Sequence, residues 1–127
     1  MLIVYESDKP MREVCAAVEP VVQKHKFGVM ASHDLKQTMA AKGVPFEGEC
    51  VIFEICNPHQ AKKVLDARPE VSTMLPCRVS VYREGGKTKI ATLQPTAMIA
   101  LLGAPELEPV AREVEEVITN IMRDAVR

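Results

Sequence analysis

Hydrophobic residues along this chain follow two spacings in turn, one typical of strands and one typical of helices. Short apolar runs predict five strands, at Leu2–Glu6, Phe27–His33 and Glu49–Cys56 and in the two arms of a hairpin within Cys77–Leu93. The hairpin is expected to turn at Gly85-Gly86. Apolar residues on both faces of Glu49–Cys56 indicate a strand with a central position in the sheet. Alternation along the second run gives it an apolar side made of Phe27, Val29, Ala31 and His33.

The first helical segment lies between the first two strands. Its apolar residues recur at three- and four-residue steps, namely Met11, Val14, Cys15, Val18, Val21 and Val22. Ser7 and Asp8 are candidate N-caps, and Pro10 is suited to the first turn. Pro20 has no backbone N–H, so we expect it to kink this helix or to end it early.

Three further helices are predicted from their capping residues and from the spacing of their apolar residues. Asp34, with Gln37 three residues later, resembles a capping box for a short helix that stops at Gly43. Another short helix is expected from Thr96 to Gly103, and a long amphipathic helix from about Pro109 to Arg127. We expect this last helix to pack against the sheet, with Val117 and Ile121 buried.

A third helix is expected directly after the strand Glu49–Cys56. Asn57 can cap it and Pro58 can occupy its first position. Its inward face is predicted to carry Ala61, Val64 and Leu65.

This order of elements predicts an α+β fold. Two adjacent hairpin strands in an otherwise alternating chain argue against a doubly wound parallel sheet. We therefore expect one domain over residues 1–127, with two layers, in which the helices cover one face of a mixed or mostly antiparallel five-stranded sheet. The uncovered face makes a homodimer the expected assembly.

Composition and hydropathy argue against two classes of partner. The net charge is −1 and the pI about 6.3, and aromatic residues make up only 4% with no Trp, so nucleic-acid binding is not expected. No run approaches the ~20 apolar residues of a membrane span, and none has the ~7–15-residue apolar region of a signal peptide. A cytoplasmic protein with reduced thiols at Cys15, Cys50, Cys56 and Cys77 is the expectation.

The stretch "EICNPHQA", from Glu54 to Ala61, carries the most specific candidate chemistry. Cys56 comes just before a predicted helix start, where free amides and the positive end of the helix dipole favour a thiolate. His59 lies in the same first turn. The structural alternative is that Cys56 ends a buried strand as a small hydrophobic residue. Burial would also oppose the thiolate, and the two interpretations remain open at this level.

Cys77 is the second candidate, because it begins the predicted hairpin at a strand end, where sites are often built. Alternation places it on the apolar side with Val79 and Val81, and places Arg78 on the other side. A ligand site of Cys56, Cys77, His59 and Arg78 would then suit a small soft ligand or a sulfur group. The alternative function is a non-enzymatic dimeric module that binds a small anion or a protein, with structural cysteines.

Other kinds of site are not supported. The cysteine and histidine spacings match no zinc template, and no C-x-x-C redox pair, P-loop or dinucleotide fingerprint occurs, so no metal or cofactor is expected. Four basic residues and one acidic residue lie between Arg78 and Lys89, which is typical of a solvated hairpin face and compatible with a small anion site.

Five ordered blocks carry a resemblance to a known family: "HDLKQT", "KGVPF", "EICNPHQAKKVL", "LPCRVSVY" and "PTAM". Together they resemble the domain of unknown function 302 family of bacteria and archaea, over essentially the whole chain. The resemblance implies a two-layer α+β fold, related in architecture to the repeat of the TATA-binding protein, and a homodimer. It implies no activity, and the DNA binding of that distant relative is not carried over, because a shared fold does not fix function. The blocks include Cys56 and Cys77, which strengthens both as site candidates.

Overall fold

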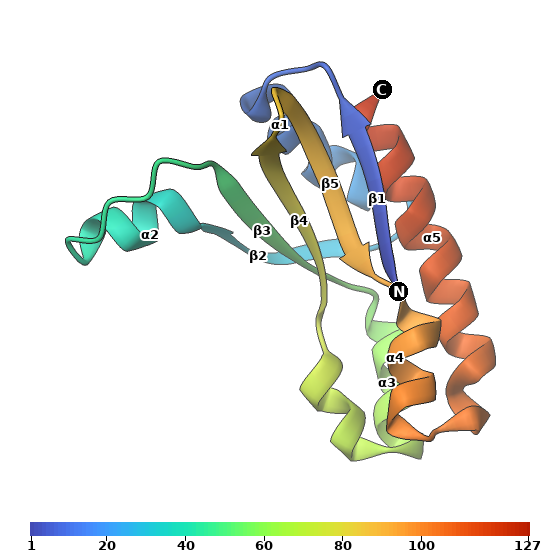
Figure 1. The fold of residues 1–127 in the computed structure, drawn as a ribbon. Coiled ribbons are helices and arrows are strands. Elements are labelled where there is room, and N and C mark those ends of the chain that lie inside the picture. Colours follow the sequence, from blue (N-terminus) through green and yellow to red (C-terminus); the bar gives the residue numbers. More distant parts are fainter.

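The computed structural model describes all 127 residues, and five strands form one antiparallel sheet in the order β1-β5-β4-β3-β2 (Figure 1). The strands are β1 Leu2–Ser7, β2 Gly28–Asp34, β3 Cys50–Cys56, β4 Cys77–Glu84 and β5 Lys87–Leu93. The helices are α1 Met11–Lys24, α2 Leu35–Ala41, α3 Pro58–Ala67, α4 Pro95–Leu102 and α5 Glu108–Val126, with short 3₁₀ helices η1 Pro69–Met74 and η2 Pro105–Leu107. The predicted α+β fold and its five strands are confirmed, and β3 has a strand on each side as expected.

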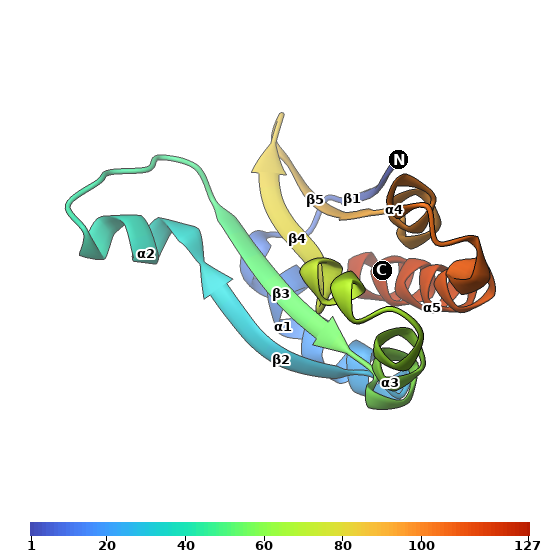
Figure 2. The same cartoon turned by 90° about the horizontal axis from the view of Figure 1, so that it is seen from below.

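The main core lies between one face of the sheet and two helices. Figures 1 and 2 show α1 and α5 on the same side of the strands. Cross-strand partners point to the same face of a sheet, so the pairs Phe53–Val79 and Val81–Ile90 mark the buried side. The cluster between these layers contains 15 buried residues, including Val14, Val18, Val22, Ile118, Ile121 and Met122.

A second, smaller core lies beyond the ends of the strands. There α3, η1, α4 and the first turns of α5 gather below the sheet in Figure 1. Six buried residues form this cluster: Val64, Val71, Ile99, Ala104, Leu107 and Ala111. The candidate site lies where this cluster meets the sheet. The hairpin of β2 and β3, with α2 at its tip, extends away from this small cluster, toward the left in Figure 2.

Helix α1 differs from the prediction at both ends. Its N-cap is Pro10, with no side-chain hydrogen bond, while the Ser7 hydroxyl instead accepts a bond of 3.1 Å from the Lys9 amide. Pro20 does not end the helix, which continues to Lys24. Pro20 and the residue four positions before it, Ala16, are both exposed, so water can bond the carbonyl that Pro20 leaves without a donor.

Two further predictions about side-chain direction were wrong. Leu65 was expected on the inward face of α3 but is 37% exposed, because only the side of the helix that carries Val64 packs against the small cluster. His33 was expected on the apolar side of β2 but is exposed, with Nε2 3.4 Å from Glu54 Oε2. The pairing of β2 with β3 shifts at Met30, and one extra residue moves every later side chain to the other face.

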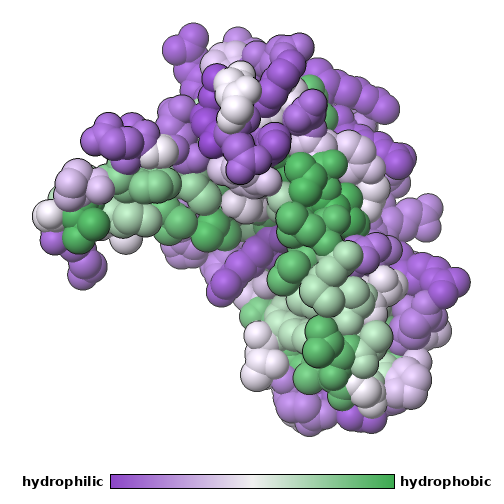
Figure 3. All heavy atoms as spheres, in the orientation of Figure 1, coloured by the Kyte–Doolittle hydropathy of each residue, from purple (hydrophilic) through white to green (hydrophobic).

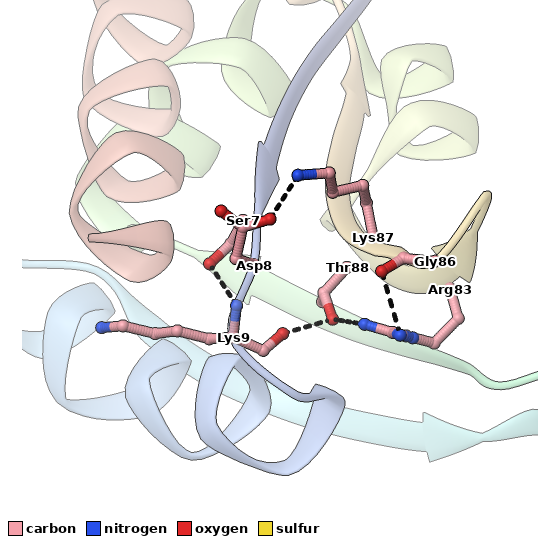
Figure 4. Close-up of polar contacts among 7 residues, drawn as sticks. All are labelled: Ser7, Asp8, Lys9, Arg83, Gly86, Lys87 and Thr88. Carbon is pink, nitrogen blue, oxygen red and sulfur yellow. Dashed lines mark hydrogen bonds and ion pairs between the residues drawn. The ribbon is translucent and has the colours of Figure 1, made fainter.

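The β4–β5 turn is held to the start of α1 by side-chain bonds (Figure 4). Gly85 and Gly86 have φ angles of 60° and 77°, which confirms the predicted tight turn. The Thr88 hydroxyl donates to the Lys9 carbonyl at 2.7 Å and accepts from Arg83 at 3.0 Å.

The basic residues of the β4–β5 hairpin have partners within the fold. Arg83 also donates to the Gly86 carbonyl, and Lys87 pairs with Asp8 (Figure 4). Lys89 pairs with Glu84 at 2.8 Å, and Arg78 lies 3.7 Å from Glu54. This arrangement gives no support to an anion site on the hairpin.

None of the helices combines the length and the apolarity needed to cross a membrane.

Truncation of Ile121 tests how strongly α5 is anchored. Its side chain is fully buried, so Ile121→Ala should lower the free energy of unfolding by about 2–5 kcal/mol through lost burial and a cavity. Val117, one turn earlier, was expected to be buried but is only partly covered. Val117→Ala is therefore the matched control and should cost clearly less in urea unfolding. Equal losses for the two variants would contradict the observed packing of α5.

Candidate functional site

The two candidate cysteines lie next to each other at one edge of the sheet. Cys56 ends β3 and Cys77 begins β4, and these strands are antiparallel neighbours. Ile55 is the cross-strand partner of Cys77, so Cys56 is only one residue further along β3. The chain enters α3 directly after Cys56, which brings both sulfurs to the junction of the sheet and the small core.

A cavity of about 60 Å³ lies at this junction and is lined by 18 residues, 15 of them hydrophobic. Both Cys56 and Cys77 contribute to its wall. The other walls come from α3, η1, α4 and α5 and include Val64, Met74, Met98, Ile99 and Val110. The expectation of a partly exposed Cys56 in a small pocket shared with Cys77 agrees with this geometry.

The predicted helix cap at Asn57 is confirmed, and it changes the chemistry expected of Cys56. Asn57 Oδ1 accepts bonds from the amides of His59 at 2.9 Å and Gln60 at 3.2 Å. Asn57 Nδ2 donates to the Lys26 carbonyl at 3.0 Å, which fixes the side chain. The amides that were expected to stabilise a Cys56 thiolate are therefore already bonded to Asn57.

Both thiols are less acidic than a free cysteine. Burial raises the pKa of Cys56, and no neighbouring cation opposes that effect. Burial also raises the pKa of Cys77 to about 11, and the negative charge that Cys56 would carry adds to this shift. Of the two opposed effects on the Cys56 pKa that the sequence left open, desolvation dominates, because the helix amides are taken by Asn57. At neutral pH both sulfurs are protonated.

The other two predicted site residues lie outside this cavity. His59 is exposed, and its contribution near the cap is the backbone amide bonded to Asn57. The Arg78 side chain is 68% exposed beside Glu54 and lines an adjacent cavity of about 220 Å³. That cavity shares Cys77 and Met98 with the first, so Arg78 lies next to the thiol pocket but does not line it.

One pocket residue was missed by the sequence analysis. Gln60 lines the cavity and is its only polar side chain besides the capping Asn57 and the two thiols. It lies four residues before Val64, which places the two on one face of α3. That spacing is the signal in the sequence, although glutamine is more common on exposed helix surfaces.

The remaining cysteines lie elsewhere. Cys15 and Cys50 line a separate cavity together with Asp34 and Glu49. Burial raises the pKa of Cys15 to about 11, and the Cys50 sulfur lies 3.6 Å from the Ser80 hydroxyl. No three or more His, Cys, Asp or Glu side chains come together in a way that would hold a metal ion.

The raised pKa values predict slow alkylation of both pocket thiols. Iodoacetamide reacts with the thiolate, so at pH 7 both thiols should react more slowly in the native protein than in urea, Cys77 by at least tenfold. The Cys77 rate should still rise with pH at pH 9.5, where an ordinary thiol of pKa ~8.5 has nearly levelled off. Quenched peptide mass spectrometry gives both rates. A Cys56 rate that levels off below pH 8 would contradict the structure.

Comparison with known proteins agrees with this fold. The family described as "Domain of unknown function DUF302" matches residues 3–125. A solved structure, "Crystal structure of uncharacterized conserved protein DUF302 from Bacillus stearothermophilus", has a TM-score of 0.92 and 29% sequence identity to this chain. The match covers 99% of this chain and 98% of that one. No match was found among the curated proteins. Because the family match extends over almost the whole chain, this protein belongs to the DUF302 family.

Proposed function

We propose that this protein binds a small, neutral, largely apolar ligand in the pocket between β3, β4 and the helical cluster, in contact with the sulfurs of Cys56 and Cys77. One observation carries the proposal: two thiols from different strands share one hydrophobic cavity. Protonated thiols offer polarizable surface and weak hydrogen bonding, which suit soft groups such as a thiol or thioether.

The chemistry of the wall limits the ligand. No charged residue lines the cavity, so an ionised ligand would lose its hydration with no opposite charge to replace it. No basic side chain in the wall activates a nucleophile, which favours binding over catalysis. A volume of about 60 Å³ also limits size. Benzene binds in apolar cavities of about 150 Å³, so the part of the ligand that enters this pocket has only a few heavy atoms.

Titration with 1-propanethiol tests the pocket. We expect saturable chemical-shift changes in amide NMR spectra at pocket residues such as Ile55, Val64 and Ile99. Ala61 lines the cavity, so Ala61→Leu should fill it and weaken binding at least tenfold. Ala67, near the end of the same helix, is exposed and outside the pocket, so Ala67→Leu is the matched control. Unchanged binding in a folded Ala61→Leu protein would contradict the proposal.

Cysteine variants in the same experiment show whether the sulfurs of Cys56 and Cys77 contribute to binding or whether these residues only fill the core. Cys56→Val and Cys77→Val retain size and hydrophobicity but remove the sulfur, and both should weaken propanethiol binding. Cys15→Val, in a different cavity, should leave it unchanged. Full affinity in both pocket variants would show that the cysteines only complete the core.

A second candidate role, self-association, is favoured by the uncovered face of the sheet. Leu2 and Leu93 are cross-strand partners on this face and are 58% and 48% exposed, and Val4 beside them is 42% exposed. Figure 3 shows hydrophobic side chains gathered over β1 and β5 and continuing over α4. Such patches commonly form protein–protein contacts. We propose a second copy as the partner, because β1 is an edge strand and a two-fold contact requires only this one patch on each copy.

Sedimentation equilibrium at micromolar concentration tests the homodimer. The wild-type protein should give about twice 14.0 kDa. Val4→Lys places a charge in the patch and should shift the mass to that of the monomer, because an unpaired charge in an interface is costly. Leu65→Lys, on α3, is a control of similar exposure and should leave the dimer intact. A wild-type monomer at these concentrations would rule out this assembly.

A further inference from the structure

Helix α4 forms part of the boundary between the thiol pocket and the larger cavity beside it. The two cavities, of about 60 and 220 Å³, share five wall residues: Met74, Leu75, Cys77, Pro95 and Met98. Pro95 and Met98 belong to α4, and Ile99 of the same helix lines only the thiol pocket. The position of α4 therefore decides how far the thiol pocket is closed toward the outer cavity.

This helix is short and almost entirely apolar. Thr96 is the one polar residue among the eight of Pro95–Leu102, and Leu101 is 72% exposed. The helix packs on α5 and η2, and Ile99 joins the small core (Figure 1). Hydrophobic contact has little directional preference, so apolar packing alone would leave the rotation and position of α4 loosely fixed.

One polar contact gives α4 a defined orientation. Glu115 Oε1, on α5, accepts hydrogen bonds from the Thr96 hydroxyl at 2.7 Å and from the Thr96 amide at 3.2 Å. No other side-chain hydrogen bond joins α4 to the rest of the chain, and Gln94, at the N-cap position, makes none. A carboxylate at the first turn of a helix bonds free amides and is favoured by the helix dipole. The Glu115 carboxylate therefore replaces the missing cap and fixes α4 to α5.

Neither partner of this contact lines a cavity, although Val114 and Pro95, their neighbours in the sequence, both line the thiol pocket. We propose that the Glu115–Thr96 contact restricts the thiol pocket to short ligands, because it holds α4 where that helix separates the two cavities. This inference rests on the proposed ligand pocket and specifies its selectivity for length. Glu115 is then a positioning residue, which acts on the ligand through α4.

Two alkanethiols of different length provide the test. 1-Pentanethiol has two methylene groups more than 1-propanethiol, and each buried methylene favours binding about fourfold where there is room for it. In amide NMR titrations the wild-type pocket, closed by α4, should bind 1-pentanethiol no more tightly than 1-propanethiol. Thr96→Val and Glu115→Ala release α4, so the longer thiol can extend into the outer cavity and should bind at least about fivefold more tightly than the shorter one.

Matched variants separate positioning from a general loss of stability. Thr96→Ser keeps both donors and should keep the wild-type ratio of the two affinities. Thr38→Val removes a hydroxyl that donates to the Asp34 carbonyl at 2.9 Å, outside both cavity walls, and should leave the ratio unchanged. The double variant Thr96→Val/Glu115→Ala should gain no more than Glu115→Ala alone, because both substitutions act on one contact.

The possible results separate this inference from the pocket itself. If the wild-type protein binds 1-propanethiol but already prefers 1-pentanethiol by about fivefold, the role of the contact is overturned and the pocket stands. The same holds if the ratio stays at the wild-type value in Glu115→Ala or in Thr96→Val. No saturable shifts with either thiol in the wild-type protein would overturn the pocket as well. A ratio that rises in both variants and stays low in Thr96→Ser would support the assignment.

Discussion

Burial of the apolar stripe of α5 is the interaction on which the other layers depend. At 1.5 Å per residue, the 19 residues of α5 extend about 28 Å, long enough to contact two separate cores. Ile118, Ile121 and Met122 pack into the main cluster under the sheet, while Leu107, just before α5, and Ala111, near its start, belong to the small one. Val110, Ala111 and Val114, between these regions, line the pocket. The cavity therefore lies where one helix passes from the first core to the second.

The position of the pocket also explains its chemistry. Antiparallel pairing of β3 with β4 brings Cys56 beside Cys77, and the small helical cluster then covers both sulfurs. The Asn57 cap takes the helix amides that would otherwise lie near Cys56. What remains is a neutral, hydrophobic pocket wall with two protonated thiols. Such a wall agrees with the proposed binding of a small neutral molecule.

Features that depend on neighbours in the sequence were predictable. Alternation and helical spacing identified the five strands and the helices, because each period follows from local backbone geometry. The turn at Gly85-Gly86 and the cap at Asn57 depend on residues within a few positions, and both are present. Pro20 does not end α1, because water can replace its missing bond on the exposed side of the helix.

By itself, the sequence determined the α+β class, the order of the main elements, the caps at Asp34 and Asn57, the turn at Gly85-Gly86, and the placement of Cys56 and Cys77 at strand ends. Only the tertiary structure decided that a register shift at Met30 exposes His33 and that Leu65 lies outside the small core. It alone also placed both thiols and Gln60 in the wall of one cavity. It also decided the raised pKa of Cys56. The physical reason is that burial and desolvation are sums over atoms brought together from distant parts of the chain, whereas periodicity and capping act within one or two turns.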